Sequence, residues 1–431
     1  MYAAELQGWI RSPSGHTASL TVSVLDRFLR YAAIDTQSIE GSETYPSTAV
    51  QLDLLHLLVD ELRAIGLKDA AVDEYGYVFA TVPASSTKGA VPVIGFLAHV
   101  DTSPEVSGKN VRPIVHRNYQ GEDLVLPDDP AAVLRARDNP ALADRIGDDI
   151  VTASGTTLLG ADNKAGVAEI MAAAEYLMAH PEIPHGPIRI AFTPDEEVGA
   201  GTKFFDVGRF DARYAYTVDG ESRGELETES FSADAMTLTF HGFNTHPGLA
   251  KGRMLNAIKV AADFISHLPK DEQSPETTAG YEGFVHPNVV QASVEKTTVR
   301  LLVRDFHVAG LKAKETMLER LAAEAASAWP GTSVEVHVEE SYRNLKEVLD
   351  RHPQAAEFAR EAIRRAGLEV LERPIRGGTD GCRLSFLGLP TPNIFAGEHN
   401  FHSRLEWISV QDMEKAVEVI VNLARIWEER C

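Results

Sequence analysis

The sequence predicts an α/β protein whose mostly parallel sheet carries helices on both faces and is interrupted by a smaller inserted domain. Apolar runs at 91–100, 188–193 and 214–218 are typical of buried strands, and amphipathic helical patterns separate them. This alternation indicates parallel strands joined by helical crossovers. Between 231 and 343 the strands instead have one apolar and one polar face, which indicates a separate antiparallel domain.

In the first part of the chain, helical patterns at 20–30 and 47–65 precede the first buried strand. Another helix is expected at 165–180, and Pro181 ends it. The segment 102–156 is rich in Asp, Pro and Gly and is predicted to be an unusually long connection. Long connections in compact domains are often functional.

The inserted domain is expected to follow the order β-α-β-β-α-β. Its first strand is indicated by Met236, Leu238 and Phe240, which alternate with polar residues. The later elements are a helix at 254–268, strands at 289–294 and 299–303, a helix at 311–329 and a strand at 334–338. This order is that of the ferredoxin-like fold.

After the insertion, α/β character resumes and completes the larger domain. Its elements are a helix at 358–366, a strand at 391–395 and an amphipathic closing helix at 411–429. The chain is therefore predicted to have a loose N-terminal extension (1–20), a larger domain in two pieces (21–230 and 344–431) and the insertion (231–343).

Composition narrows the class of protein. The chain has 431 residues and a formal net charge of −22, so it repels phosphate backbones and anionic membrane surfaces. No apolar stretch approaches the roughly 20 residues that span a bilayer. With only Cys382 and Cys431, a disulfide framework is absent and a reducing cytoplasm is expected. Nucleic acid and membranes are therefore not expected as partners.

Ligand-type side chains recur where apolar runs end, and together they predict a metal site. They are His99, Asp162, the Glu196–Glu197 pair, Asp219 and His402. Imidazole and carboxylate groups bind divalent ions such as zinc, and the ends of strands in α/β sheets are where such groups converge. Each fragment alone has an ordinary explanation, such as a solvated turn. Their joint occurrence, in order, favours a site with two metal ions.

Charge and geometry suggest roles within this site. Two divalent ions bring four positive charges, which Asp162, Glu197, Asp219 and one hydroxide would neutralise. Asp162 stands alone at a Gly-rich turn before a helix and is the best candidate to bridge both ions. Asp101 leaves the same face of extended backbone as His99 and is suited to fix its tautomer. Of the adjacent Glu196 and Glu197, one can bind metal while the other acts as a base.

Several motifs also resemble a known family, the aminoacylase–carboxypeptidase family of two-zinc exopeptidases. They are FLAHVDT at 96–102, LLGADNKAG at 158–166 and FTPDEEVG at 192–199. Further motifs resemble its tripeptide aminopeptidases: SGKNV at 107–111, HPGLAKG at 246–252, IRGGTDG at 375–381 and GLPTPNIF at 388–395. The resemblance runs from about residue 24 to 426, nearly the whole chain.

The resemblance implies specific roles for these residues. His99, Asp162 and Asp219 would bind one zinc, and Asp162, Glu197 and His402 the other. Asp101 and Glu196 would be the catalytic residues. The fold implied is a zinc-exopeptidase α/β domain with an inserted lid that often mediates dimerisation, so a homodimer through 231–343 is expected. The peptide bond after Asp162 is expected to be cis.

We therefore expect a di-zinc aminopeptidase that releases the N-terminal residue of tripeptides. A water between the metals would attack the scissile carbonyl after Glu196 takes its proton. The expected substrate-binding residues are His246, Asn256 and Arg304 of the insertion and Arg376 of the larger domain, with the arginines gripping the substrate carboxylate. For Arg304, the alternative is a surface ion pair with Asp305.

Two other functions are compatible with the sequence. One is a related dipeptidase or N-acyl amino acid hydrolase with the same metal centre. The other is a non-catalytic metal-binding dimerisation protein. Loss of Glu196 or of a ligand would favour the latter, and none is missing.

Overall fold

The computed structural model describes residues 22–431, so the extension expected at 1–20 lies outside the described residues. The chain forms two compact units. Among the described residues, the main unit comprises 22–228 together with Val348–Arg373 and Thr379–Cys431. The inserted unit comprises Glu229–Glu347 and the short segment Pro374–Gly378. This short segment was expected in the larger domain, and its place in the inserted unit corrects that expectation.

The main unit is built on a mixed sheet whose four central strands are parallel. The strands, in spatial order, are β1 (Ala71–Val72), β2 (Val78–Val82), β8 (Ile188–Thr193), β3 (Ile94–His99), β9 (Tyr214–Gly220), β16 (Asn393–Phe395), β10 (Glu225–Glu227) and β15 (Leu371–Glu372). From β8 to β16 every pairing is parallel, whereas β1, β2 and β10 pair antiparallel with their inner neighbours. The carboxyl ends of the central strands therefore share one edge.

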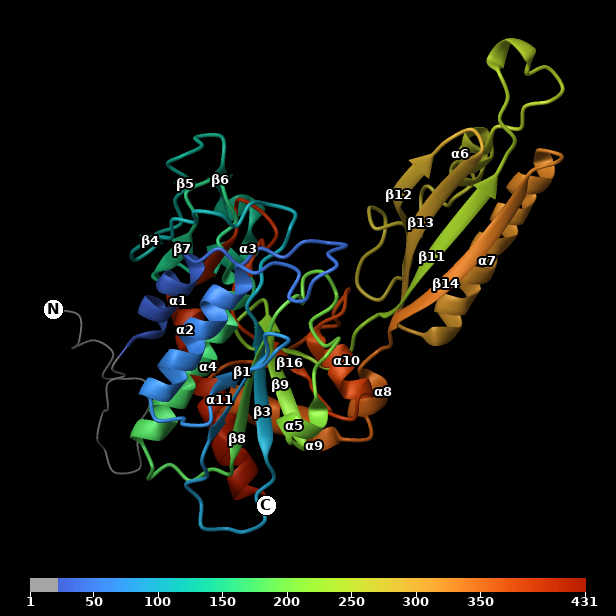
Figure 1. Ribbon diagram of the computed structural model, residues 1–431. Coiled ribbons are helices and arrows are strands. Elements are labelled where there is room, and N and C mark those ends of the chain that lie inside the picture. The colour runs from blue at the N-terminus through green and yellow to red at the C-terminus, as the bar shows by residue number, and fades with distance from the viewer. Residues whose placement is uncertain (1–21) are drawn as a thin grey trace. The chain divides into compact units, whose positions relative to one another are not determined.

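One face of this sheet packs against long helices that Figure 1 shows side by side. They are α1 (Val24–Ala32), α2 (Gln51–Ala64), α4 (Ala161–Ala179) and α11 (Val410–Glu429), with α9 (Pro353–Arg365) against α11. Ile170 of α4 and Ile420 of α11 meet Phe96 of β3. The buried guanidinium of Arg27 lies 2.7 Å from Glu61 and 2.8 Å from Glu175, which joins α1, α2 and α4.

The opposite face of the sheet is covered by shorter elements. They include α5 (Val207–Phe210) and α10 (Asp380–Phe386). Phe210 and Leu384 from these helices form one buried cluster with Phe79, Leu97 and Ala215 of the sheet. The sheet thus has helices on both faces, as the sequence predicts.

A second sheet occupies part of the segment expected to be a long connection. Its strands are β4 (Ile114–His116), β7 (Ile150–Thr152), β18 (Trp407–Ser409) and β17 (Glu398–His399), and β5 (Leu124–Val125) pairs with β6 (Val133–Leu134). The same segment holds the short helix α3 (Pro140–Ala143). The sequence pattern did not show these strands because they are only two or three residues long and the partner of β7, strand β18, lies about 250 residues later in the chain.

The inserted unit follows the predicted order β-α-β-β-α-β. Its elements are β11 (Ser232–His241), α6 (Ala257–Ser266), β12 (Phe284–Ala292), β13 (Lys296–Asp305), α7 (Val308–Ala328) and β14 (Ser333–Tyr342). The strand order β12-β13-β11-β14 is antiparallel throughout. Met236, Leu238 and Phe240 of β11 are buried in one core with Leu311 and Leu318 of α7, so the helices cover a single face of this sheet (Figure 1).

Within residues 22–431, no helix has the length and apolar character needed to cross a membrane.

Candidate metal centre

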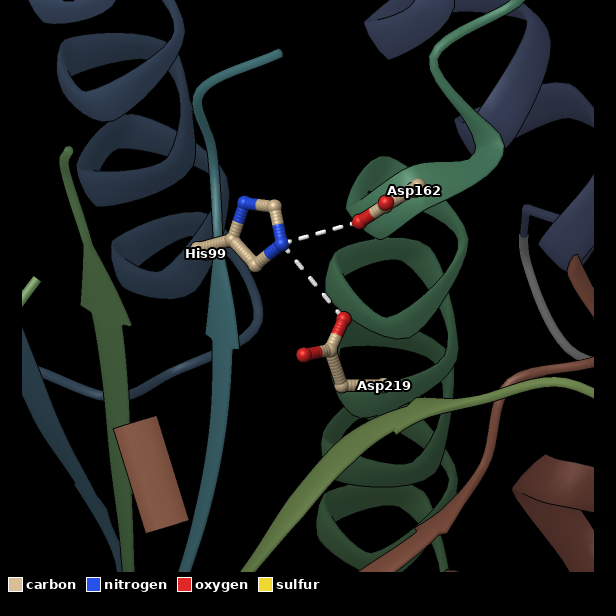
Figure 2. Close-up of side chains that lie close together, drawn as sticks. All are labelled: His99, Asp162 and Asp219. Carbon is tan, nitrogen blue, oxygen red and sulfur yellow. Dashed lines mark hydrogen bonds and ion pairs between the residues drawn. The ribbon is translucent and has the colours of Figure 1, made fainter. Parts of the chain in front are cut away.

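His99 ends strand β3 and turns its ring toward two carboxylates. Its Nε2 lies 2.9 Å from Asp162 Oδ1 and 3.4 Å from Asp219 Oδ1, contacts that Figure 2 marks with dashed lines. Asp162 lies at the start of α4, and Asp219 lies near the end of β9, the strand beside β3. Three potential metal ligands therefore meet at the carboxyl edge of the parallel strands.

A second group of ligand-type side chains shares Asp162. His402 Nε2 lies 3.2 Å from Asp162 Oδ2 and 2.7 Å from Glu197 Oε2. Asp162 thus presents one oxygen to His99 and the other to His402. In each group of three, the ligand atoms lie within 4.8 Å of one another. This geometry suits a carboxylate that bridges two ions.

The backbone around the shared carboxylate has unusual conformations. The Asp162–Asn163 peptide bond is cis, as the resemblance implies. Gly160, the residue before α4, has φ 78°, and His402 has φ 57°, so both adopt left-handed backbone. Left-handed backbone is unusual for a residue with a Cβ, and such residues cluster at functional sites.

The residues present fit two divalent ions. Glu197 Oε1 and Asp219 Oδ1 are buried and have no hydrogen-bond partner among the described residues. A buried carboxylate oxygen of this kind is costly unless a cation or donor satisfies it. Zinc ligands at about 2.0–2.1 Å in a tetrahedron lie about 3.3 Å apart. The separations of 2.9 and 3.4 Å around His99 Nε2 are close to that spacing.

The pKa values of the clustered side chains also indicate a site that favours cations. Burial raises the pKa of Glu197 to about 8, and repulsion from Asp162 adds to this effect. Burial opposes a charge on His402, but hydrogen bonds to Asp162 and Glu197 raise its pKa to about 11. Burial also opposes a charge on His99, yet the Asp219, Asp101 and Asp162 carboxylates raise its pKa well above the usual value. The carboxylates therefore favour additional positive charge in this cluster.

Glu196 lies beside the cluster and belongs to neither ligand group. Its pKa is raised well above the ordinary value because burial, reinforced by Asp380, Asp219 and Glu197, outweighs the opposing effect of His99. A glutamate with a raised pKa is suited to accept a proton and later donate it. The structure therefore separates the adjacent glutamates into a metal-ligand candidate, Glu197, and a base candidate, Glu196.

Asp101 contacts both His99 and the turn that carries Glu196 and Glu197. His99 Nδ1, the nitrogen opposite the one that faces Asp162, lies 3.1 Å from the backbone O of Asp101 and 3.3 Å from its Oδ1. The two side-chain oxygens of Asp101 also accept hydrogen bonds from the backbone N–H groups of Glu196 and Glu197, at 3.0 and 3.2 Å. Its carboxylate is fully buried. Asp101 thus directs the His99 Nε2 lone pair toward the cluster and holds the turn that carries the two glutamates.

The same turn is anchored from its other side by Asp195. Its carboxylate accepts hydrogen bonds from Ser47 N at 2.6 Å and from Gln51 Nε2 at 2.7 Å. The backbone of Asp195 has φ 60°, which redirects the chain after β8. The Glu-Glu turn is therefore a fixed element of the centre rather than a solvated loop.

Glu398 and Glu406 are among the buried carboxylates near the centre that sequence reasoning missed. Glu406 accepts three backbone hydrogen bonds from the segment that leads into α4. Glu398 is buried close to Asp162 and Asp219, and its Oε2 has no hydrogen-bond partner among the described residues. Glu398 follows the apolar run at 394–397, which was an available signal. Glu406 follows no such run, and its proximity to His402 in sequence was the signal for it.

The inserted unit contains three of the predicted substrate-binding residues. His246 Nδ1 accepts a hydrogen bond from Gly248 N at 3.2 Å, which leaves the proton of the neutral ring on Nε2. Asn256 caps α6 by accepting from Ile258 N. Arg304 Nη1 donates to Val303 O at 3.1 Å, and its guanidinium lies 5.4 Å from the Tyr342 ring.

Arg376 also lies in the inserted unit, in the segment Pro374–Gly378. Its Nη1 donates to Gly280 O and Glu282 O, and its Nη2 donates to Thr278 Oγ1 at 2.9 Å. The guanidinium lies 5.2 Å from the Phe231 ring. These contacts explain why the segment packs with the insertion, because they satisfy most of the donors of Arg376 with backbone at 278–282.

Comparison with known proteins identifies the family. Residues 152–426 match the family model described as Peptidase family M20/M25/M40. The chain belongs to this family. Over 407 residues it is 48% identical to peptidase T of Geobacillus kaustophilus, and the match covers 94% of this chain and 98% of that protein. Peptidase T of Listeria monocytogenes is also 48% identical over 407 residues, covering 94% of this chain and 99% of that protein.

A solved structure from the family shares the fold. The aminopeptidase PepT from Bacillus cereus superposes with a TM-score of 0.71 at 22% sequence identity, covering 94% of this chain and 98% of that one. At this identity the likeness shows the fold alone. Within the family, the chain is an enzyme of the peptidase class with two groups of residues that could hold a metal ion.

Proposed function

We propose that this protein is a di-zinc aminopeptidase that releases the N-terminal residue of tripeptides. The observation that carries the proposal is that Asp162 is shared by two ligand groups with Glu196 beside them, in a chain 48% identical to proteins named peptidase T. His99, Asp162 and Asp219 would hold one ion, and Asp162, Glu197 and His402 the other. When bound, the ions would polarise the scissile carbonyl and lower the pKa of a water molecule.

The side chains of this chain would then move protons and hold groups in place. Glu196 would accept a proton from the attacking water and deliver it to the departing amine nitrogen. Asp101 would keep the proton of His99 on Nδ1, so that Nε2 stays available as a ligand. Glu197 is held next to Glu196 by the same carboxylate and would remain a ligand throughout.

We further propose that residues of the inserted unit bind the substrate. His246, whose Nε2 carries the proton in the neutral ring, is suited to donate a hydrogen bond to the developing oxyanion. Asn256 would donate through its amide nitrogen, since its oxygen caps α6. Arg304 would bind the C-terminal carboxylate of the tripeptide, because Asp305 pairs with Lys314 instead. Arg376 would support this by fixing the backbone at 278–282.

We also propose a cytoplasmic homodimer. The chain has two cysteines, too few for a disulfide framework, which agrees with a reducing compartment. Within the inserted unit β14 pairs on one side only, with β11, so its other edge is open to a strand of a second copy. Sedimentation analysis of the purified chain would test this state, and a monomer at micromolar concentration would contradict it.

One assay tests the enzymatic proposal. The purified protein is offered dipeptides, tripeptides, tetrapeptides and N-acyl amino acids, with zinc and after treatment with a chelator. We expect tripeptides with a free amino group to be cleaved fastest, loss of activity after chelation, and recovery on adding zinc. Faster cleavage of N-acyl amino acids or dipeptides would contradict the proposed substrate class. Activity that survives complete metal removal would contradict the proposed chemistry.

A further inference from the structure

Glu406 is a fully buried residue whose carboxylate contacts the backbone of one proposed metal ligand, Asp162, and the side chain of none. Its Oε2 accepts hydrogen bonds from Leu159 N at 2.6 Å and from Gly160 N at 2.8 Å, and its Oε1 accepts from Asp162 N at 3.0 Å. Its relative exposure is 1%. Both oxygens are therefore occupied by backbone donors of the segment that enters α4.

These hydrogen bonds hold the backbone that leads into α4, and one of them reaches its first turn at Asp162 N. The first N–H groups of an α-helix have no acceptor within the helix, and a negative charge is favoured there. Gly160 lies just before α4 in left-handed backbone and has no side chain to cap the helix. The Glu406 carboxylate instead accepts from Asp162 N in the first turn and from Leu159 N and Gly160 N just before the helix, from 244 residues or more away in sequence.

Glu406 also belongs to the segment that carries His402. Between them, Ser403 Oγ donates to Asn400 O at 2.6 Å, and Leu405 N donates to Ser403 Oγ at 3.1 Å, so the loop is closed on itself. One end of this loop places His402 Nε2 3.2 Å from Asp162 Oδ2, and the other end holds the Asp162 backbone N–H. The same loop thus contacts Asp162 twice, once at the side chain and once at the backbone.

We propose that Glu406 is a positioning residue of the metal centre. It sets the orientation of the shared Asp162 carboxylate relative to His402 by clamping the backbone at 159–162. This inference rests on the metal centre of the proposed function and is independent of which substrate is cleaved. Groups behind metal ligands typically change metal affinity by about 10–100-fold when they are lost.

The test uses Glu406→Gln in the full chain. A glutamine side chain has one acceptor oxygen and one NH₂ group, so it cannot receive hydrogen bonds from both Asp162 N and the Leu159–Gly160 pair. The matched control is Glu225→Gln. Glu225 is also buried in the main unit and accepts a backbone hydrogen bond, from Ser222 N at 2.8 Å, without contacting a proposed metal ligand.

The main readout is the zinc dissociation constant, measured by competition with a chromophoric chelator in the absence of peptide. We expect about a 10–100-fold weaker affinity for Glu406→Gln, with two ions still bound at saturation, and an unchanged affinity for Glu225→Gln. The melting temperatures of the two metal-free variants should be similar. This readout does not depend on tripeptide cleavage, so a wrong substrate assignment and a wrong role for Glu406 give different results.

Two outcomes would overturn the proposal. One is a zinc affinity of Glu406→Gln equal to that of the unmodified protein. If Glu406→Gln does not fold, Glu406→Asp serves instead, because it keeps the charge but is one methylene too short to reach all three N–H groups. The second outcome is that neither variant folds while Glu225→Gln does. Glu406 would then stabilise the main unit as a whole and would not act specifically on the metal centre.

Discussion

The carboxylate of Asp101 accepts a hydrogen bond from the backbone N–H of Glu196, with 3.0 Å between the nitrogen and Oδ1. The same Oδ1 lies 3.3 Å from His99 Nδ1. A single buried side chain therefore joins the first metal-ligand candidate to the candidate base. Any change that disturbs Asp101 should affect both at once.

Asp101→Asn is expected to lower activity without unfolding the protein. The amide nitrogen would replace one of the two oxygens, each of which accepts a backbone N–H, so either Glu196 N or Glu197 N would lose its acceptor. We expect kcat/KM or zinc affinity to fall by about 10–100-fold. Asp73→Asn is the matched control, because Asp73 Oδ1 accepts from Tyr75 N and Tyr77 N away from the metal centre. Equal losses in both variants would contradict a specific role for Asp101.

The two adjacent glutamates should respond differently to loss of charge. Glu196→Gln removes a group that moves a proton, so turnover should fall by at least about 100-fold while two ions remain bound. Glu197→Gln removes a proposed ligand 2.7 Å from His402 Nε2, so metal content should fall toward one ion per chain. Elemental analysis alongside kcat distinguishes the two. Substantial activity in a metal-replete Glu196→Gln protein would exclude it as the base.

Arg304→Ala tests how the length of the peptide is recognised. If the Arg304 guanidinium binds the substrate carboxylate, the variant should lose much more activity on a free tripeptide than on the tripeptide amide, which lacks that charge. Arg300 lies on the same strand and is exposed, so Arg300→Ala should change neither rate. Arg376→Ala should lower both rates equally, because it loosens the backbone at 278–282. An equal loss on acid and amide for Arg304→Ala would refute the assignment.

Glu414 should make stability depend on pH. Burial raises the pKa of this carboxyl to about 7, and Asp149 and Asp148 add to the effect. A carboxyl with a higher pKa in the folded state contributes stability below its ordinary value near 4.5, and that contribution is lost as pH rises through 7. Glu414→Gln, which stays neutral, should therefore be more stable than the unmodified protein at pH 8, by about 1–3 kcal/mol. The difference should vanish near pH 4.5.

Urea unfolding at both pH values measures this difference. Glu418 is the control, because it lies one turn later in α11 with its carboxylate 2.8 Å from Lys415 Nζ. Glu418→Gln also removes one negative charge from a chain of net charge −22, but it should not gain stability at pH 8. A similar gain in both variants would mean that overall charge, and not the buried Glu414, is responsible.

Some features follow from the sequence because local patterns determine them. The buried strand at 188–193 has the predicted bounds, since a mostly apolar run between a proline turn and a Pro-Asp turn leaves little alternative. The order of elements in the insertion follows from the change from continuous to alternating apolar residues. Parallel strands end at a common edge, so His99 and Asp219, each near the end of such a strand, are brought together by the sheet itself.

Other features are decided only by the tertiary structure, because the interacting segments are far apart in sequence. Strand β7, within 102–156, pairs with β18 from about 250 residues later in the chain, and the segment at 374–378 packs with the insertion through the hydrogen bonds of Arg376. Apart from its proximity to His402, nothing in the sequence distinguishes Glu406 from other loop residues, and only the fold places its carboxylate at the start of α4. The sequence by itself thus determined which groups could bind metal, whereas the fold determined which buried carboxylates hold those groups in place.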